Sequence, residues 1–447
     1  HHLPIFYLRV PLLIYFHPVS NVFAFFLFFI FVTSIFAGNQ SRRLGKLDTL
    51  DFSNYYSLGL NAGKYSSSIE YPDLSCVGAV YSDSGILGTG TLIAPNIVVT
   101  AAHVLKNSSS APTPTPSEWK FILHSNFDRA PASSKYEIEK IVIHPSWIAR
   151  LPQMGGAGDG DILGVDLALL FLKQNITQIY PAKLNYSKTE KTGERVVLSG
   201  YGSLADGVQG VLSTQNDQRL GGENILDRVV EEVDAPHVVK THRGGILAID
   251  FDAPQANSNS LGANLPLVDY LGDGNSSAFP LSLESSTAVG DSGGPIFIWA
   301  DGAWRVVGTV SYGTADSQYG DITVYTRLTS QIEWIQAYFP KFAQARDLGV
   351  NGWKELDWFG SFFSLPNNWS FHQLHGWFYN ETSNGESFWA WQGNHLGWWW
   401  ACLSLYPYIY SDSLQSWLFI DVEYSTPGNL IYFNYDLMSW NKIVNSP

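Results

Sequence analysis

The sequence predicts a mainly β protein in two parts, a long all-β domain followed by a shorter β domain rich in tryptophan. Three observations support this prediction. The chain has 447 residues, which is long for one typical domain. Short β-type runs separated by Gly, Asn, Asp, Ser and Pro follow one another from residue 75 to residue 325, the pattern of a β-sandwich or barrel. Eleven of the sixteen tryptophans lie at or beyond Trp353.

The composition narrows the classes of partner and site. The formal net charge is −14, which argues against a nucleic-acid or anionic-membrane partner, since both reward clustered Lys and Arg. Hydrophobic residues make up 45% of the chain, enough for a sizeable core. Only two cysteines occur, which excludes a disulfide framework and a thiolate-rich metal site. We expect Cys76 and Cys402 to be two buried thiols rather than a bridge between domains.

Residues 1–37 have the character of an export signal. Val22 to Val32 is a run of eleven apolar residues, too short for a membrane span of about 20 residues but suited to the apolar region of a secretory signal. Ala37 is a small residue at the expected cleavage point, and an uncleaved anchor is the alternative. Both readings predict a secreted or cell-envelope protein. Residues 38–69 are then an N-terminal extension.

The β-type runs define the expected strands of the first domain, residues 70–340. Each run combines β-branched, aromatic or other apolar residues and is bounded by turn-forming residues. The expected strands are Val77–Tyr81, Ile97–Thr100, Ile138–His144, Leu167–Leu172, Arg195–Tyr201, Ile246–Phe251, Pro295–Trp299, Trp304–Ser311 and Asp321–Thr326.

One helix is expected at the end of this domain. Ser330 and Glu333 have the spacing of a capping box, in which the two side chains satisfy each other's free backbone N–H groups. Apolar residues then repeat at helical spacing, and Pro340 ends the run. These apolar residues are Leu328, Ile332, Ile335 and Phe339.

Residues 341–350 are expected to be a linker, and residues 351–447 an aromatic repeat domain. The phrases Leu374–Tyr379 and His395–Trp400 are two versions of one pattern 21 residues apart, and Ser416–Ile420 resembles a third. A repeat this short suggests stacked hairpins with aromatic residues between them. We expect most of these aromatic residues to form the core and a few to be exposed for binding sugar rings or other flat surfaces.

Three segments carry residues suited to nucleophilic catalysis. They are Thr100–His103, Asp166–Leu170 and Gly290–Pro295. A serine hydroxyl needs a base within hydrogen-bond reach, and that base needs an acceptor that fixes its tautomer. His103, Asp166 and Ser292 supply these roles. The glycines around Ser292 allow a tight turn in which the N–H groups of Gly290 and Ser292 form an oxyanion hole, each donor worth about 3–4 kcal/mol.

Other residues compete for chemical roles. Asp159 and Asp161 are alternatives to Asp166, or a calcium pair, although they lie in a Gly-rich stretch without a following apolar strand. His372 and His375 have the spacing of helical metal ligands, but their surroundings predict strand and turn, so structural histidines are favoured. The predicted chemistry needs no metal and no cofactor.

The three segments, in this order, resemble the signatures of the trypsin/chymotrypsin-like serine peptidases. The resemblance covers about residues 70 to 340 and implies two packed antiparallel β-barrels with a C-terminal helix, a site in the cleft between them, and peptide-bond hydrolysis through an acyl-enzyme. Residues 351–447 are similar in style to aromatic repeat modules at the C-termini of exported bacterial proteins, and more loosely to hairpin repeats that bind cell-wall polymers.

The resemblance also assigns substrate-binding residues. Ser311 and Gly313 lie on a strand whose backbone pairs with an extended substrate. Ser286 corresponds to the floor of the pocket for the residue before the cut bond, and it is not acidic. Thr323 narrows this pocket, whereas Gly313 leaves its entrance open. These residues imply a preference for small to medium uncharged side chains.

The sequence departs from the family in two ways. Val104, Gly88 and Ala288 stand where the family usually has cysteines. There is also no typical mature N-terminus, whose freed amine in the family pairs with the aspartate before the nucleophile, here Asp291. Two alternatives follow: another group holds Asp291, or activation differs from the family's usual route.

These observations predict an exported serine endopeptidase that acts on protein or peptide substrates. The C-terminal domain is expected to bind a cell-wall or polysaccharide ligand. One alternative is a catalytically inactive protein that keeps the peptidase fold as a scaffold, anchored through the Trp-rich domain. Another is an esterase with the α/β-hydrolase fold, since Gly290 to Gly294 fits G-x-S-x-G. In that fold, however, the triad follows the order Ser, Asp, His and strands alternate with helices, and neither feature is found in this sequence.

Overall fold

The computed structural model describes most of the chain after residue 42, and the expected signal at residues 1–37 lies outside the described residues. Within the described ranges, no helix combines the length and the apolar character needed to cross a membrane. The described residues are 43–61, 70–154, 162–213, 216–232, 244–262, 271–313, 317–383, 385–393 and 396–444. The expected mainly β class is confirmed.

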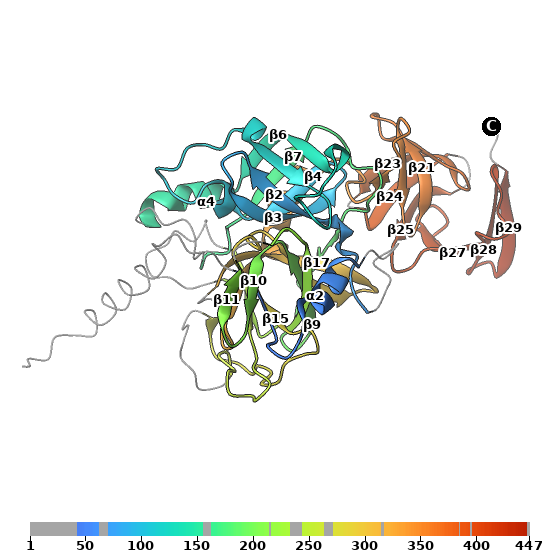
Figure 1. Cartoon of the computed structure of the whole chain (residues 1–447). Helices are drawn as coiled ribbons and strands as arrows, with labels where there is room; N and C mark the ends of the chain where they lie inside the picture. The colour runs from blue at the N-terminus through green and yellow to red at the C-terminus, as the bar shows by residue number, and fades with distance from the viewer. Residues whose placement is uncertain are drawn as a thin grey trace, which may run out of the picture. The chain divides into compact units, whose positions relative to one another are not determined.

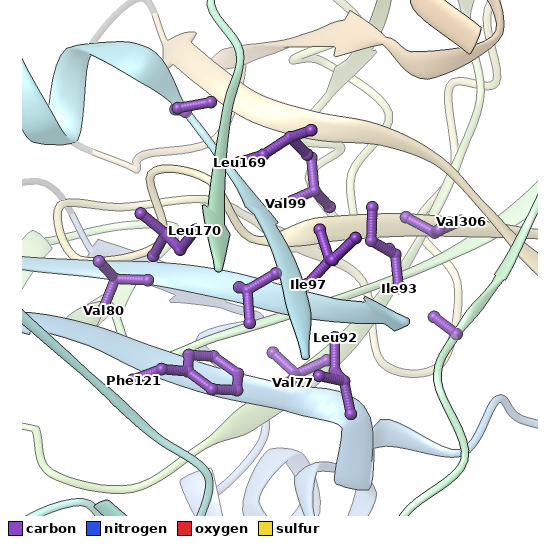
Figure 2. Packing of buried hydrophobic residues seen from close by; sticks show 14 of the residues in the cluster. Val77, Val80, Leu92, Ile93, Ile97, Val99, Phe121, Leu169, Leu170 and Val306 are labelled. Atoms are coloured by element: carbon purple, nitrogen blue, oxygen red, sulfur yellow. The ribbon is translucent and has the colours of Figure 1, made fainter. Parts of the chain in front are cut away.

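The first half of the long domain is a closed six-stranded barrel (Figure 1). Its interior is filled by β-branched and leucine side chains together with Phe121, and Figure 2 shows part of this cluster. Val306, from a strand outside the barrel, belongs to the same buried cluster and links the barrel to the next sheet. In order around the barrel, the strands are β2 (Val77–Ser82), β3 (Leu87–Ala94), β4 (Ile97–Thr100), β7 (Ala168–Leu172), β6 (Lys135–Ile143) and β5 (Trp119–Ile122).

In its described residues, the second half forms an open sheet and not a second closed barrel. Its main path is antiparallel, and the short strand β8 (Lys183–Leu184) adds to β17 in parallel. The expectation of two barrels is therefore confirmed for the first half and met only by a half-barrel in the second. The path is β12 (Leu220–Ile225), β9 (Arg195–Gly200), β16 (Pro295–Ala300), β17 (Ala303–Gly313), β18 (Ile322–Arg327), β14 (Ile246–Asp250) and β13 (Arg228–Val230).

A four-stranded sheet incorporates the N-terminal segment. Sequence analysis placed residues 38–69 outside the domain, but Tyr55 belongs to the buried cluster of the second half and Leu58 to that of the barrel. These few apolar side chains gave no recognisable sequence pattern, because their burial depends on distant strands. The elements are α2 (Phe52–Gly59) and, in sheet order, β11 (Gly210–Ser213), β10 (Ser203–Asp206), β1 (Arg43–Lys46) and β15 (Ser285–Ser286).

The expected terminal helix is shorter than predicted, and its capping box does not form. A 3-10 turn, η7 (Leu328–Gln331), leads into α5 (Ile332–Gln336), which has no side-chain cap. Ser330 instead donates to the carbonyl of Arg327 at 2.7 Å and accepts from the N–H of Gly245 at 2.8 Å. A contact with a distant segment thus replaces the local cap. The other short helices are η1 (Leu74–Cys76), α3 (Ala102–Leu105), η2 (Pro116–Glu118), η3 (Ala132–Ser134), α4 (Pro145–Arg150) and η4 (Leu151–Met154).

The C-terminal part is one antiparallel sheet of eleven strands, β19 to β29, in chain order. Each strand pairs with its neighbours in the sequence, so the expected hairpins are present as a continuous meander. The strands are β19 (Arg346–Asp347), β20 (Trp353–Leu356), β21 (Gly360–Ser364), β22 (Trp369–His372), β23 (Gly376–Ser383), β24 (Ser387–Gln392), β25 (Gly397–Cys402), β26 (Tyr408–Ser411), β27 (Ser416–Ile420), β28 (Asn429–Asn434) and β29 (Ser439–Val444).

The core of this sheet is built mainly from phenylalanine and aliphatic side chains, not from tryptophan. Among the eleven tryptophans from Trp353 onward, Trp399 alone is buried. The expectation that most of the aromatic residues form the core is therefore wrong for tryptophan. The reason is strand alternation: in β24, Phe388 points into the core, while Trp389 and Trp391 point to the other face.

The face opposite the core carries aromatic residues that lie directly across from one another on successive strands. Four such rows are present, each spanning four strands. Cross-strand aromatic pairs stabilise a sheet by roughly 0.2–1 kcal/mol each. The rows are Trp353–Phe363–Phe371–Trp377, Trp369–Tyr379–Trp391–Trp398, Trp389–Trp400–Tyr410–Trp417 and Tyr408–Phe419–Phe433–Trp440.

Residues 341–350, the expected linker, pack against the neighbouring parts of the chain and include strand β19. Phe342 and Ala345 are buried in the core of the C-terminal sheet. The side chain of Gln344 donates to the carbonyl of Ala182 at 2.7 Å. Cys76 and Cys402 are both free and buried, as predicted.

Candidate active site

His103, Asp166 and Ser292 come together although 189 residues separate the first from the last. His103 lies in the short helix after β4, Asp166 precedes β7, and Ser292 precedes β16. The distance from His103 Nδ1 to Asp166 Oδ2 is 2.7 Å, and that from His103 Nε2 to Ser292 Oγ is 2.8 Å. Both distances allow the proton transfers that activate a serine nucleophile.

Asp166 is fully buried, and its carboxylate accepts hydrogen bonds from several groups. The N–H of His103 donates to Oδ1 at 2.9 Å, and the hydroxyl of Ser311 donates to Oδ2 at 2.7 Å. These bonds fix the carboxylate, which in turn fixes the orientation of the imidazole. Sequence analysis assigned Ser311 to substrate binding. The structure places its side chain on the aspartate of the triad.

Two glycines with positive φ lie close to Ser292 on either side. Gly290 and Gly293 have φ values of +95° and +81°, which favour glycine. Thr89 holds this loop: its hydroxyl donates to the carbonyl of Gly290 at 2.6 Å, and its N–H donates to the carbonyl of Ser292 at 2.8 Å. Within the described residues, the N–H groups of Gly290 and Ser292 have no acceptor. They are therefore available to a substrate oxygen.

Asp291 is held by backbone N–H groups. Its carboxylate accepts from Gly202 at 2.7 Å and from Ala288 at 2.9 Å. A Cβ would lie 2.0 Å from a carboxylate oxygen if added at Gly200 and 2.2 Å if added at Gly202, so the chain closes tightly around the group. Burial raises the pKa of Asp291 to about 7, although the two N–H groups oppose this shift. The sequence left two alternatives, another partner for Asp291 or a different route of activation. The N–H groups of Gly202 and Ala288 are such a partner.

A small pocket opens beside Ser292. It encloses about 290 Å³, its mouth included. Gly313 and Thr323 line it, whereas Ser286 is buried behind the lining, and the assignment of these residues to substrate binding stays a prediction. The hydroxyl oxygens of Thr287 and Thr323 are 3.0 Å apart across one side. The other lining residues are Ala288, Val310, Tyr312, Asp321 and Ile322.

Two residues of the site were not identified from the sequence. Thr89 supports the oxyanion loop from more than 200 residues away, and no local motif marks it. Asp321 lines the substrate pocket, and its carboxylate accepts from the N–H of Gln318 at 3.1 Å. Its position two residues before Thr323 was the one available sequence signal.

The four residues considered as alternative metal ligands are two aspartates and two histidines. Asp159 and Asp161 lie outside the described residues. His372 and His375 pack among aromatic rings, with the ring of His375 stacked on that of Trp399 at 4.9 Å. Burial lowers the pKa of His372 to about 4, so its ring stays neutral. In the described part of the chain, no group of three or more His, Cys, Asp or Glu residues has the arrangement of a metal site.

A closed barrel, a half-barrel and a Ser–His–Asp group contributed by both fit the trypsin-like fold. In agreement with this, residues 88–308 match the family model described as "Trypsin-like peptidase domain". The matched residues include the whole triad and end before the C-terminal sheet. They support a trypsin-like peptidase domain in this chain, and the resemblance of the C-terminal sheet to aromatic repeat modules stays a prediction.

Curated relatives agree with this assignment. Vitamin K-dependent protein C from Rattus norvegicus is 26% identical over 256 residues, which are 56% of this chain and 45% of the relative. Vitamin K-dependent protein C from Mus musculus is 23% identical over the same share of each chain. Spermosin from Halocynthia roretzi is 37% identical over 62 residues, 14% of this chain and 16% of the relative. The chain thus spans less than half of the length of these relatives.

Proposed function

We propose that this chain is an exported serine endopeptidase that cleaves proteins or peptides through an acyl-enzyme. The observation that carries the proposal is the hydrogen-bonded series from Asp166 to His103 to Ser292, with distances of 2.7 and 2.8 Å. A serine next to glycines is by itself an ordinary turn. A serine joined to a histidine that is oriented by a buried carboxylate is an activated nucleophile.

The proposed cycle uses only residues of the described site. His103 takes the proton of Ser292 as Oγ attacks the peptide carbonyl carbon, and Asp166 stabilises the imidazolium that forms. The N–H groups of Gly290 and Ser292 stabilise the oxyanion. His103 then protonates the leaving amine, which departs and leaves an ester on Ser292. Water, deprotonated by His103, attacks this ester, and His103 returns the proton to Ser292 Oγ as the acid product leaves.

A covalent probe tests the proposed activity most directly. A fluorophosphonate should label wild type at Ser292 and should not label Ser292→Ala. Peptide hydrolysis by this variant should fall by about 10⁶-fold, as in other triads that lose the nucleophile. A folded, secreted wild type that neither labels nor cleaves peptides would instead favour the inactive scaffold.

The pocket supports a preference for small to medium uncharged side chains before the cut bond. Thr323 occupies its lining, and Gly313 leaves its mouth without a side chain. Among the described residues, a Cβ at Gly313 would meet only the carbonyl oxygen of Ile322, at 3.4 Å, so Gly313→Val should fold while narrowing the mouth. The variant should lose activity on peptides with Val or Leu at this position more than on those with Ala. Fastest cleavage after Arg or Lys by wild type would contradict the proposed preference.

We propose in addition that the C-terminal sheet binds a cell-wall polysaccharide. The support is the aromatic face opposite its core, on which Trp377, Trp389 and Trp417 have exposed fractions of 46%, 38% and 40%. Aromatic rings on a solvated face can stack on sugar rings. Trp389→Ala and Trp417→Ala should weaken co-sedimentation with insoluble peptidoglycan or chitin. Tyr424→Ala provides the control, because Tyr424 is 72% exposed but lies outside the strands.

A further inference from the structure

An N-terminal strand lies directly behind the substrate pocket. β1 pairs with β10 on one side and with β15 on the other, with Gly45 opposite Ser286. Ser286 comes immediately before Thr287 and Ala288, which line the pocket. A Cβ at Gly45 would lie 2.6 Å from Ser286 Oγ and 2.7 Å from the carbonyl oxygen of Ser317. The absence of a side chain at residue 45 therefore lets β1 approach the pocket floor closely.

A buried tyrosine provides the second attachment to the floor. The Tyr55 side chain is fully buried, and its hydroxyl donates to the carbonyl of Glu284 at 2.9 Å. The same hydroxyl accepts from the N–H of Leu47 at 3.1 Å. Burial raises the pKa of Tyr55, so the group remains a neutral hydroxyl that can do both. It thereby joins the segment after β1 to the residue before β15.

The third attachment reaches another part of the pocket wall. The hydroxyl of Tyr319 donates to Asp48 Oδ1 at 2.6 Å and accepts from the N–H of Asp48 at 3.0 Å. The ring of Tyr319 also contacts that of Phe251, with centroids 4.8 Å apart. Asp321 and Ile322, which follow shortly after Tyr319, line the pocket. Movement of Asp48 would therefore be transmitted to this wall.

We infer that residues 45–59, here called the N-terminal brace, set the shape of the pocket for the side chain before the cut bond. The brace is a positioning element, because it acts on the pocket through β15 and Tyr319 and contributes no residue to the pocket lining. The inference rests on the proposed peptidase function, since it assigns a determinant of selectivity to the same pocket. Changes in the brace should therefore alter the cleavage of peptides more than they alter the intrinsic reactivity of Ser292.

Two conservative variants test the brace. Tyr55→Phe removes the hydroxyl that joins Leu47 to Glu284, and Tyr319→Phe removes both hydrogen bonds to Asp48. The matched control is Tyr56→Phe, because Tyr56 is half-buried and, within the described ranges, its hydroxyl makes a single long contact of 3.4 Å with Asn216. Each protein is assayed on peptides that differ only in the residue before the cut bond. The labelling rate with a small fluorophosphonate without a peptide part is measured in parallel.

The expected result separates selectivity from chemistry. Tyr55→Phe should lower kcat/KM for the best peptide by about fivefold, mostly through KM, as expected if only part of the energy of its two lost hydrogen bonds is felt in peptide binding. The ratio between the best peptide and a peptide one methylene larger should shrink, while the labelling rate stays within about twofold of wild type. Tyr319→Phe should act in the same direction, and Tyr56→Phe should match wild type in every measurement.

Each contrary result has a distinct meaning. If wild type cleaves peptides and neither variant changes the selectivity ratio, the role of the brace is refuted. It is also refuted if the labelling rate and the kcat/KM values for all peptides fall by the same factor. If Tyr55→Phe shows no thermal transition, Tyr319→Phe decides the question, since its side chain is only half-buried. Failure of wild type to label at Ser292 would overturn the proposed function itself, which a change in selectivity alone cannot do.

Discussion

The backbone cradle of Asp291 makes a sharp prediction for Gly202→Ala. The added Cβ would lie 2.2 Å from Asp291 Oδ2 and 2.5 Å from its Cγ, well inside contact distance. Asp291 is buried, so its carboxylate cannot swing into solvent and must shift within the loop. The shift strains the bonds from Gly202 and Ala288, and it moves the residue between the two proposed oxyanion donors.

The size of the effect follows from these contacts. Overpacking a close-packed site costs about 1–3 kcal/mol, and each lost hydrogen bond to an ionised group about 1.5–3 kcal/mol. Misplacing one oxyanion donor lowers kcat by about 10²–10³-fold. We therefore expect Gly202→Ala to lower kcat by at least about 100-fold with a small change in KM, and to slow fluorophosphonate labelling in proportion.

Gly302→Ala is the matched control. Gly302 has a φ of +76°, and an added Cβ there would meet no atom within 4 Å. Its replacement should cost about 1 kcal/mol of backbone strain, visible as a lower thermal midpoint, and leave kcat unchanged. If folded Gly202→Ala keeps the kcat of wild type, the cradle does not order the oxyanion loop, and the reasoning is wrong.

Three further predictions concern the triad, pH and the C-terminal sheet. Ser311→Ala should lower kcat/KM by about 30-fold, because it removes a buried hydrogen bond worth about 2 kcal/mol from the triad carboxylate, and steady-state kinetics measure this. Burial raises the pKa of Asp227 to about 9 and that of Asp252 to about 7, so the folded state holds protons that the unfolded state releases. Stability should therefore fall as the pH rises from 6 to 10, and calorimetry that shows a constant or rising midpoint would contradict this. Phe388→Ala should cost about 3–5 kcal/mol of unfolding free energy in denaturant titrations, whereas Trp389→Ala, one residue along and on the exposed face, should cost less than about 1 kcal/mol.

The grouping of His103, Asp166 and Ser292 was predictable because the proposed chemistry restricts these residue types locally. His103 and Ser292 each lie in a short motif, and the apolar strand that follows Asp166 distinguished it from Asp159 and Asp161. Thr89 and Tyr55 could not be found in this way. Their roles arise from contacts across more than 200 residues, and a threonine or a tyrosine in a β-rich sequence carries no mark of its partner.

Two local patterns gave wrong expectations for different reasons. The capping box at Ser330 is a local preference of about 1 kcal/mol, and here the Ser330 side chain bonds Arg327 and Gly245 instead. The exposed face of the tryptophans could have been predicted, because successive residues of a strand such as Phe388 and Trp389 point to opposite faces of the sheet. Treating the aromatic residues as one class concealed which of the two faces each would occupy.

The meander of the C-terminal sheet has a consequence for how the two parts of the chain acquire their folds. Every strand from β19 to β29 pairs with its neighbours in the sequence, so this sheet can form by successive local steps. The triad instead requires His103 and Ser292, 189 residues apart, to meet. The chain between them must therefore be closed into a loop, and the entropy lost in this step is paid before any contact compensates for it. We expect the aromatic face to appear early in refolding and the capacity to react with a covalent probe to appear last. Labelling of Ser292 would then mark the completion of the slowest pairings in the molecule.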